Sequence, residues 1–252
     1  MTKNNKKIKI KIGIIGGSGL DDPKILNNFS EKSIRTPFGN PSGKITLGKI
    51  GKTEVAILAR HGKKHTIIPT HVPYRANIWA LQKIGCTHII ATTACGSLRE
   101  NLKPGDIIFP DQFIDNTKHR ILTFYEDKLI HTPMSEPFSK ELRKKLENTA
   151  KKMKIKYHNH GTMITIEGPR FSTKAESHMF RGWGADLINM STVPEVILAN
   201  ELGIPYQSIA MATDYDCWKE NEEPVTLEMI LEIMKKNSEK VKKLLIETIA
   251  NF

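Results

Sequence analysis

Apolar and polar positions in the first third of the chain form short strand-like runs that end at glycines. Residues 7–15 change from alternating to wholly apolar before a run of glycines, which predicts a first strand leading into a turn. Residues 44–59 predict a hairpin that turns through Gly48 and Gly51. Apolar residues at helical spacing then predict a helix over 74–84.

The middle and the end of the chain alternate between strand-like runs and patterns with helical spacing. A β-branched apolar run predicts a buried strand at 87–94, and an amphipathic pattern predicts a helix at 136–153. A further strand is predicted at 161–166. A long apolar stripe predicts a final helix over 226–249.

The clearest single unit lies late in the chain. Residues 186–190 predict a strand, and Thr192 and Glu195 have the spacing of a capping box for a helix that runs to residue 202. Residues 206–213 predict a second strand. This strand–helix–strand order implies parallel strands covered by helices. We therefore expect one α/β domain.

Composition indicates the cellular compartment of such a domain. Hydrophobic residues make up 39% of the chain and charged residues 26%, as in an ordinary globular protein. No run approaches the roughly 20 apolar residues that span a bilayer, and the basic start of the chain lacks the apolar core of a signal peptide. We expect a cytoplasmic protein with no membrane partner and a frayed basic terminus at residues 1–9. Three widely spaced cysteines predict reduced thiols rather than disulfides or a zinc site.

The formal net charge of +11 raises the possibility of a nucleic-acid partner. The lysines are scattered along the chain, however, and no nucleic-acid recognition motif accompanies them. We therefore interpret them as solvated helix faces whose summed field favours an anionic substrate, and we expect no nucleic-acid partner. A basic nucleic-acid-binding protein remains the alternative from a different class.

Small and polar residues follow several of the predicted strands. Ligands of open α/β sheets collect outside the carboxyl ends of the strands, so these positions form one candidate site. They are the pairs or triplets at 17–18, 60–61, 92–94, 190–191 and 213–214.

The glycine turn after the first strand is open to two interpretations. Its backbone N–H groups and the Ser18 hydroxyl could hold a phosphate, or the glycines could serve the turn alone. Asp22 stands where a dinucleotide-binding fingerprint has its third glycine, which disfavours a dehydrogenase.

Arg60 and His61 follow a predicted strand directly. An arginine fork can bind phosphate through two hydrogen bonds, and the neighbouring imidazole can donate another or orient the anion. A surface arginine beside a structural histidine is the simpler interpretation of this pair alone. His61 and His65 also have the i,i+4 spacing of zinc ligands, but the glutamate of the usual helical motif is missing, so we expect no metal. The hydroxyl and N–H of Thr93 could complete a phosphate site.

Asp214 and Asp216 end the last predicted strand. Extended residues two apart project to the same side, so both carboxylates can face one ligand. A purine offers matching groups, because N7 must gain a proton or hydrogen bond as the base leaves and N6 carries an amine. A protonated carboxyl with a raised pKa could serve N7 as a general acid. An acidic surface loop and a divalent-cation site remain equally open from these residues alone.

Nine segments with distinctive sequences follow one another along almost the whole chain. They include GIIGGSGLDDP at 13–23, ARHGKKHTIIP at 59–69 and SIAMATDYDCWKE at 208–220. The others lie at 36–43, 74–81, 85–100, 104–115, 161–173 and 184–206. Together, in this order, they resemble the purine nucleoside phosphorylase family, and within it the subfamily that acts on S-methyl-5′-thioadenosine.

The resemblance implies a single nucleoside phosphorylase domain over residues 1–252, in which a twisted mixed β-sheet is flanked by helices on both faces. It implies a pentosyltransferase of purine and methionine salvage that uses phosphate to release adenine and 5-methylthio-α-D-ribose 1-phosphate. Phosphate is itself a substrate, so no cofactor is expected. A homotrimer or a dimer of trimers is expected. The alternative within enzymes is a broader phosphorylase that accepts adenosine or inosine.

The resemblance also assigns individual residues. For phosphate it implies Ser18, Arg60, His61, Thr93, the backbone of Ala94, and Ser191. For the nucleoside it implies Thr213, Met190 against the ribose, Phe171 on the base, Asp214 at N7 and Asp216 at N6, with Asp214 and His61 as the catalytic pair. For the 5′-methylthio group it implies Leu227, Ile230 and Leu231, and His131 would reach the 5′ pocket of a neighbouring subunit.

Overall fold

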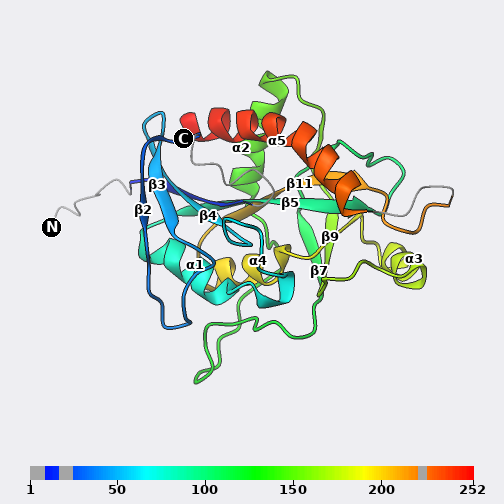
Figure 1. The fold of residues 1–252 in the computed structure, drawn as a ribbon, viewed down its shortest axis with the longest axis horizontal. Helices are drawn as coiled ribbons and strands as arrows, with labels where there is room; N and C mark the ends of the chain where they lie inside the picture. The colour runs from blue at the N-terminus through cyan, green and yellow to red at the C-terminus, as the bar shows by residue number, and fades with distance from the viewer. Residues whose placement is uncertain (1–8, 17–24, 221–225) are drawn as a thin grey trace.

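A mixed β-sheet of eleven strands forms the centre of the molecule (Figure 1). The structure is a computed structural model, and it describes residues 9–16, 25–220 and 226–252. The predicted frayed terminus at residues 1–9 therefore lies almost wholly outside the described residues. No helix in the described ranges is long and apolar enough to cross a membrane.

Four parallel strands make up the middle of the sheet. β1 (Lys11–Gly16) lies between β4 (Thr53–Ala59) and β5 (His88–Ser97), and β11 (Tyr206–Asp214) pairs with β5. Their nearly unbroken burial, which includes polar residues of β5 and β11, matches strands that are covered on both faces. The carboxyl ends of all four strands consequently point to one edge of the sheet.

The predicted hairpin turns at one glycine and not at two. β3 (Ile45–Ile50) and β4 are antiparallel neighbours, and Gly51, with a φ of 57°, lies in the turn between them. Gly48 lies inside β3, where a Cβ atom would stand 2.8 Å from the Cβ of Leu26. Glycine is therefore required at position 48 by close packing and not by a turn. The neighbouring strand there is β2 (Asn27–Lys32), which pairs with β3.

The remaining strands correct the prediction of a simple parallel unit at 186–213. β10 (Leu187–Asn189) runs antiparallel to β5, whereas β11 runs parallel to it, so the two strands that flank the helix have opposite directions. The sheet continues beyond β10 through β9 (Thr162–Ile166) to β7 (Gln112–Asn116), and β6 (Ile107–Ile108) and β8 (Tyr157–His158) extend it beside β11. The antiparallel pairs of β10 with β5 and of β6 with β11, together with β2–β3 and β3–β4, make the sheet mixed.

Helices cover both faces of the sheet, as predicted (Figure 1). α1 (Tyr74–Lys83) and α4 (Thr192–Glu201) lie on one face, and α2 (Lys140–Lys152) and α5 (Leu227–Ala250) lie on the other. The sheet separates two hydrophobic cores, and β1 contributes to both. Ile12 and Ile14 pack in the core under α2 and α5, and Ile15 packs in the core under α1 and α4. α3 (Lys174–Gly182) and a short 3-10 helix, η2 (Pro69–His71), complete the described helices.

The capping box predicted at Thr192 is wrong. Ser191 is the N-cap of α4 and makes no capping hydrogen bond through its side chain, and Val193 inside the first turn is not helical. The Thr192 hydroxyl instead accepts a hydrogen bond from Asn189. Glu195 does not reach back to the helix start, because its carboxylate is bound to Arg60. A capping box does form at α3, between Thr173 and Glu176.

Candidate active site

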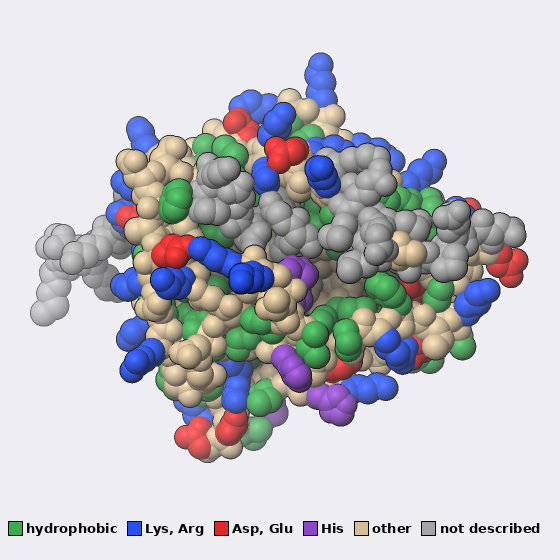
Figure 2. All heavy atoms as spheres, in the orientation of Figure 1, with side chains coloured by type: hydrophobic (Ala, Val, Ile, Leu, Met, Phe, Trp, Pro, Cys, Tyr) green, Lys and Arg blue, Asp and Glu red, His purple; other side chains and the backbone are tan. Residues whose placement is uncertain are grey.

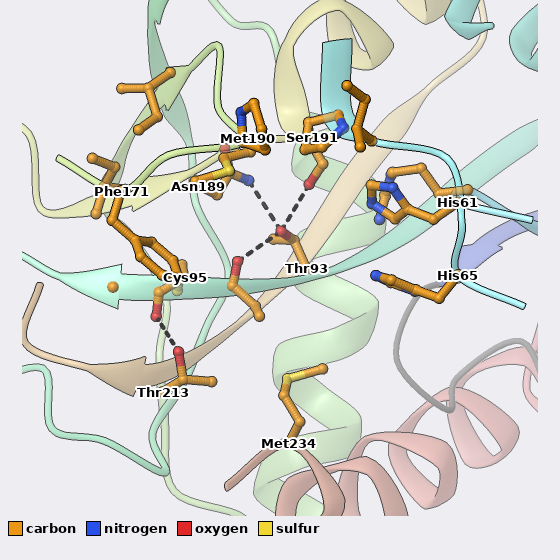
Figure 3. A pocket seen from close by; sticks show the side chains of 18 of the residues that line it. His61, His65, Thr93, Cys95, Phe171, Asn189, Met190, Ser191, Thr213 and Met234 are labelled. Atoms are coloured by element: carbon orange, nitrogen blue, oxygen red, sulfur yellow. Dashed lines mark hydrogen bonds between the residues drawn. The ribbon is translucent and has the colours of Figure 1, made fainter. Parts of the chain in front are cut away.

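A cavity of about 770 Å³ lies at the carboxyl edge of the central strands. It is lined by residues that follow β4, by residues 92–96 of β5, and by residues that follow β10 and end β11. Figure 3 shows that these segments, distant in sequence, direct side chains to a common space. Four of the five predicted strand ends, those at 60–61, 92–94, 190–191 and 213–214, line this cavity, and the fifth, at 17–18, lies outside the described residues. The volume suits a small molecule.

One side of the cavity, which we call the hydroxyl half, is formed by Arg60, His61, Thr93 and Ser191. The Thr93 and Ser191 hydroxyl oxygens lie 2.9 Å apart, although the residues come from β5 and from the start of α4. The Asn189 amide donates to the Thr93 hydroxyl at 3.1 Å (Figure 3). Thr93 already accepts from Asn189, so its own hydrogen is left to point at Ala94 O, at Ser191 or at a ligand.

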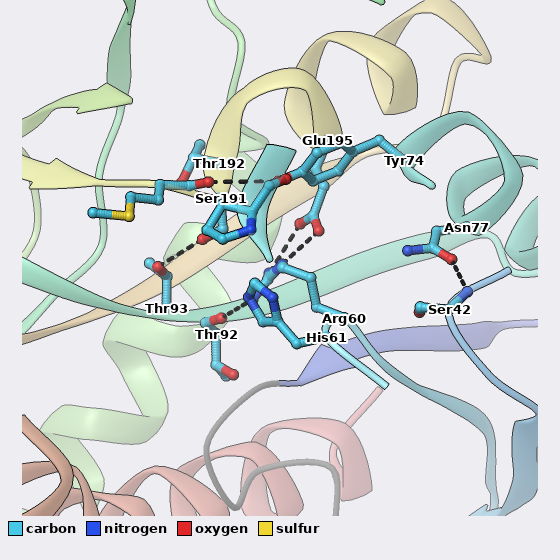
Figure 4. Close-up of polar contacts among 12 residues, drawn as sticks. Ser42, Arg60, His61, Tyr74, Asn77, Thr92, Thr93, Ser191, Thr192 and Glu195 are labelled. Carbon is cyan, nitrogen blue, oxygen red and sulfur yellow. Dashed lines mark hydrogen bonds and ion pairs between the residues drawn. The ribbon is translucent and has the colours of Figure 1, made fainter. Parts of the chain in front are cut away.

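Arg60 is held in a buried ion pair. Its Nε and Nη2 atoms donate to the two carboxylate oxygens of Glu195 at 2.6 and 2.9 Å, and its Nη1 atom donates to Thr92 O at 2.9 Å (Figure 4). Burial acts to lower the pKa of Arg60, and the charge and hydrogen bonds of Glu195 outweigh it, so that the pKa is raised. The Nε and Nη2 side of the guanidinium, which could have bound phosphate through two hydrogen bonds, is thus occupied by Glu195. Only the remaining N–H groups can reach a ligand.

His61 is held as a neutral ring. Its Nδ1 atom lies 2.8 Å from Ile67 O, and because a carbonyl oxygen only accepts, Nδ1 carries the proton. Burial, helped by the charge of Arg60, lowers the pKa of His61 to about 4. The free Nε2 atom of the neutral ring is therefore an acceptor. It can receive a hydrogen bond from a protonated phosphate oxygen and so orient the anion, which is one of the two roles predicted for His61, whereas donation to the anion would require a proton on Nε2.

This environment predicts how stability varies with pH. The folded pKa of His61, about 4, lies below its ordinary value of 6.5, so the unfolded chain binds more protons between these limits. His61 therefore lowers stability progressively as the pH falls from 6.5 toward 4. We expect the melting temperature to fall less between pH 7 and pH 5 in His61→Gln than in the unaltered protein, as measured by thermal unfolding. An equal fall in both proteins would contradict this description of His61.

The opposite side of the cavity, which we call the acidic half, contains Asp214 and Asp216. The Thr213 hydroxyl donates to one oxygen of Asp214 at 2.7 Å, and the backbone N–H of Asp216 donates to the other at 2.7 Å. Burial nevertheless raises the pKa of Asp214. Burial also raises the pKa of Asp216, and the neighbouring Asp214 carboxylate raises it further. Both groups consequently hold a proton more readily than exposed aspartates do.

The two carboxylates face the cavity for a different reason than predicted. β11 ends at Asp214, and Asp216 has a left-handed φ of 53°, so the pair does not lie on one extended strand. A turn after the strand returns Asp216 to the cavity, and Tyr215 is not among the lining residues. Gly96 of β5 makes room, because a Cβ there would lie 3.0 Å from an Asp214 oxygen.

Phe171 and Met190 also line the cavity, as predicted from the resemblance. Ser18 and the side chains of Leu227, Ile230 and Leu231 lie outside the described residues. Met234, one turn further along α5, does line the cavity (Figure 3). His131 is exposed in the segment between β7 and α2 and is not a lining residue.

Four further residues belong to the site that sequence reasoning did not select. Glu195 binds Arg60, Asn189 donates to Thr93, and Cys95 and Ser172 line the acidic half. Asn189 ends a strand and could have been included for that reason. Glu195 was interpreted as a capping residue, and the pairing with Arg60 gives no local signal because 135 positions separate the two residues.

Metal ligands and basic patches were the alternatives to a small-molecule site. No group of three or more His, Cys, Asp or Glu side chains within the described ranges could hold a metal ion. Lys and Arg side chains are spread around the face shown in Figure 2 and do not gather in one patch. Fold and cavity together define an α/β protein that binds a small molecule between a hydroxyl half and an acidic half.

Comparisons with known proteins identify the family to which this α/β protein belongs. The family model described as Phosphorylase superfamily matches residues 11–250. S-Methyl-5′-thioadenosine phosphorylase of Xenopus tropicalis is 59% identical over 247 residues, which cover 95% of this chain and 88% of that protein. The structure is similar to methylthioadenosine phosphorylase from Schistosoma mansoni in complex with adenine, with a TM-score of 0.93 and 44% identity over 96% of this chain and 91% of that one.

A second structure from that organism is also similar. A mutant of its adenosine/methylthioadenosine phosphorylase in complex with methylthioadenosine has a TM-score of 0.92 and 43% identity, covering 96% of this chain and 91% of that one. This chain belongs to the phosphorylase superfamily and, within it, to the S-methyl-5′-thioadenosine phosphorylases.

Proposed function

We propose that the protein cleaves S-methyl-5′-thioadenosine with inorganic phosphate, giving adenine and 5-methylthio-α-D-ribose 1-phosphate. The observation that carries this proposal is the combination, in one cavity, of a hydroxyl half suited to an anion and an acidic half suited to an aminopurine. The membership of the S-methyl-5′-thioadenosine phosphorylases supports the same reaction.

The hydroxyl half binds the phosphate nucleophile, and the acidic half binds the departing base. Phosphate, bound by the Thr93 and Ser191 hydroxyls and the free N–H groups of Arg60, attacks C1′ of the sugar as the bond from C1′ to the purine breaks. The electron pair of that bond passes to the purine ring. The protonated Asp214 carboxyl donates to N7 of the departing base, since burial raises the pKa of this group. Asp216 accepts a hydrogen bond from the N6 amine.

The charge change explains why both halves are needed. The sugar becomes positively charged as the base leaves, and a phosphate held below the ring stabilises that charge. The base becomes negatively charged at the same time, and the acidic half neutralises it. His61 accepts the hydrogen of a protonated phosphate oxygen and thereby fixes the orientation of the nucleophile.

A panel of nucleosides tests this assignment. Release of free base from S-methyl-5′-thioadenosine, adenosine and inosine is measured with saturating phosphate. We expect the highest kcat/KM for S-methyl-5′-thioadenosine, a lower value for adenosine and little cleavage of inosine. Comparable values for all three would favour the broader purine nucleoside phosphorylase.

The preference for the 6-amino base is expected to depend on the two aspartates. A carboxylate accepts a hydrogen bond from an amine but cannot donate to the O6 atom of a 6-oxopurine, whereas an amide can. The double variant Asp214→Asn, Asp216→Asn should therefore shift the ratio of kcat/KM values toward inosine. An unchanged ratio of the kcat/KM values for adenosine and inosine would show that these side chains do not distinguish a 6-amino from a 6-oxo purine.

We also propose that the protein works as a homotrimer in the cytoplasm. The segment that carries His131 exposes neighbouring apolar side chains, with Leu129 84% exposed and Ile130 42% exposed, as an interface between copies would require. The free state of Cys86, Cys95 and Cys217 supports a reducing compartment. Light scattering of the purified protein tests the trimer, and a monomer would contradict it.

A further inference from the structure

Glu195 is the most deeply buried acidic side chain near the hydroxyl half, with an exposed fraction of 0%, and the proposed reaction gives it no part. Its partner Arg60 is only 2% exposed. Figure 4 shows the Glu195 carboxylate from α4 facing the guanidinium of Arg60, which follows β4. Removing two charges from water carries a large desolvation penalty, which only strong mutual contacts can offset.

Hydrogen bonds determine the orientation of the guanidinium completely. Glu195 takes one N–H from Nε and one from Nη2, and Thr92 O takes one from Nη1. Three of the five N–H groups of Arg60 are thus fixed, and one on each Nη atom remains for a ligand. The Tyr206 hydroxyl, donating to Glu195 at 3.0 Å, fixes the carboxylate in turn.

The same pair removes the net charge from the hydroxyl half. His61 is neutral at ordinary pH because burial lowers its pKa to about 4. Arg120, whose charge also reaches His61, is bound to Glu167. Lys63, at the cavity edge, is bound to Glu31. Among the described arginines and lysines at this cavity, Arg60 therefore carries the charge that would dominate an anion at Thr93 and Ser191, and Glu195 cancels it.

We propose that Glu195 is a positioning residue that sets both the direction and the effective charge of Arg60, and so keeps bound phosphate electron-rich for attack on the sugar. This inference rests on the proposed phosphorolysis. An uncompensated guanidinium would hold phosphate more tightly before the reaction and would weaken the attraction between phosphate and the positive charge that develops on the sugar. Only interactions that strengthen in the transition state raise kcat.

Glu195→Gln tests the charge, because it keeps the size of the side chain and removes its negative charge. We expect a lower melting temperature without phosphate, since Arg60 is left buried and unpaired. Inorganic phosphate should then raise the melting temperature more than in the unaltered protein, because the bound anion replaces the lost carboxylate. The KM for phosphate should fall at least about 10-fold, and kcat should fall as well.

Two control variants separate charge from geometry and packing. Glu195→Asp keeps the charge but retracts the carboxylate, so kcat should fall while the KM for phosphate stays within about fivefold of its original value. Tyr206→Phe removes one hydrogen bond from the same carboxylate and leaves both charges, and it should not lower the KM for phosphate. All titrations are made at constant ionic strength with chloride.

Three results would overturn the proposal. An unchanged response of Glu195→Gln to phosphate would make Glu195 structural, and weaker phosphate binding would mean that Glu195 acts through geometry alone. A Glu195→Gln protein that does not fold even in saturating phosphate would show that an anion does not replace the carboxylate. If phosphate fails to stabilise the unaltered protein, the proposed function fails instead, which distinguishes the two.

Discussion

Replacing Asp214 with alanine is expected to lower kcat by about 10²- to 10⁴-fold, the contribution that a positioned general acid makes. The variant removes the only group placed to donate to N7 in the proposed arrangement, while the Thr213 and Asp216 contacts it loses are local. Steady-state release of adenine measures the effect. Asp115→Ala, on the outer strand β7, is the matched control and should leave kcat unchanged.

The pH profile gives an independent test of the same residue. Burial raises the pKa of Asp214, so its protonated form persists to higher pH than in an exposed aspartate. If the acid must be protonated, kcat falls as the pH rises through that raised pKa. Asp214→Asn keeps a hydrogen-bond donor that does not titrate, and it should lose this falling limb at a lower overall rate. A kcat of Asp214→Ala near the original value would rule out the assigned role.

Replacing Arg60 with methionine should have the largest effect on stability. It leaves the Glu195 carboxylate buried without its partner, which costs about 3–5 kcal/mol and lowers the melting temperature by roughly 10 °C. Phosphate should also bind about 10- to 100-fold more weakly, because a hydrogen bond to a charged group contributes about 1.5–3 kcal/mol. Thermal unfolding and the KM for phosphate measure the two effects.

The double variant Arg60→Met, Glu195→Gln is the control for this prediction. It removes both charges, so it should regain much of the stability that Arg60→Met loses. It should not regain phosphate affinity, since no guanidinium remains. If both single variants were as stable as the unaltered protein, the buried ion pair would not contribute as described.

The sequence was sufficient to predict the helices and strands whose apolar residues follow a regular spacing or form a continuous run. The amphipathic patterns predicted α1 and α5 to within two residues, and the apolar runs predicted β1, β5 and β11. Strand direction was not predictable from the same patterns. β10 and β11 have the sequence of a parallel unit, yet β10 pairs antiparallel with the far end of β5, a long-range pairing that the local pattern does not contain.

Site residues were predictable where they end a strand, as Asp214 does, or directly follow one, as Arg60 and His61 do. Glu195 was not, because the spacing from Thr192 also fits a capping box and only the folded chain brings Arg60 to the carboxylate. The orientation of Asp216 was right for the wrong reason, since its backbone is left-handed and not extended. Long-range contacts and local backbone conformation account for these errors.

Phosphorolysis, as opposed to hydrolysis, is the central claim, and the products distinguish the two directly. S-Methyl-5′-thioadenosine is incubated with the protein and inorganic phosphate, and the reaction is followed by 31P NMR together with the release of adenine. We predict that a sugar 1-phosphate forms in equal amount to adenine and that no adenine is released without phosphate. Adenine release that continues without phosphate and yields the free sugar would contradict the account.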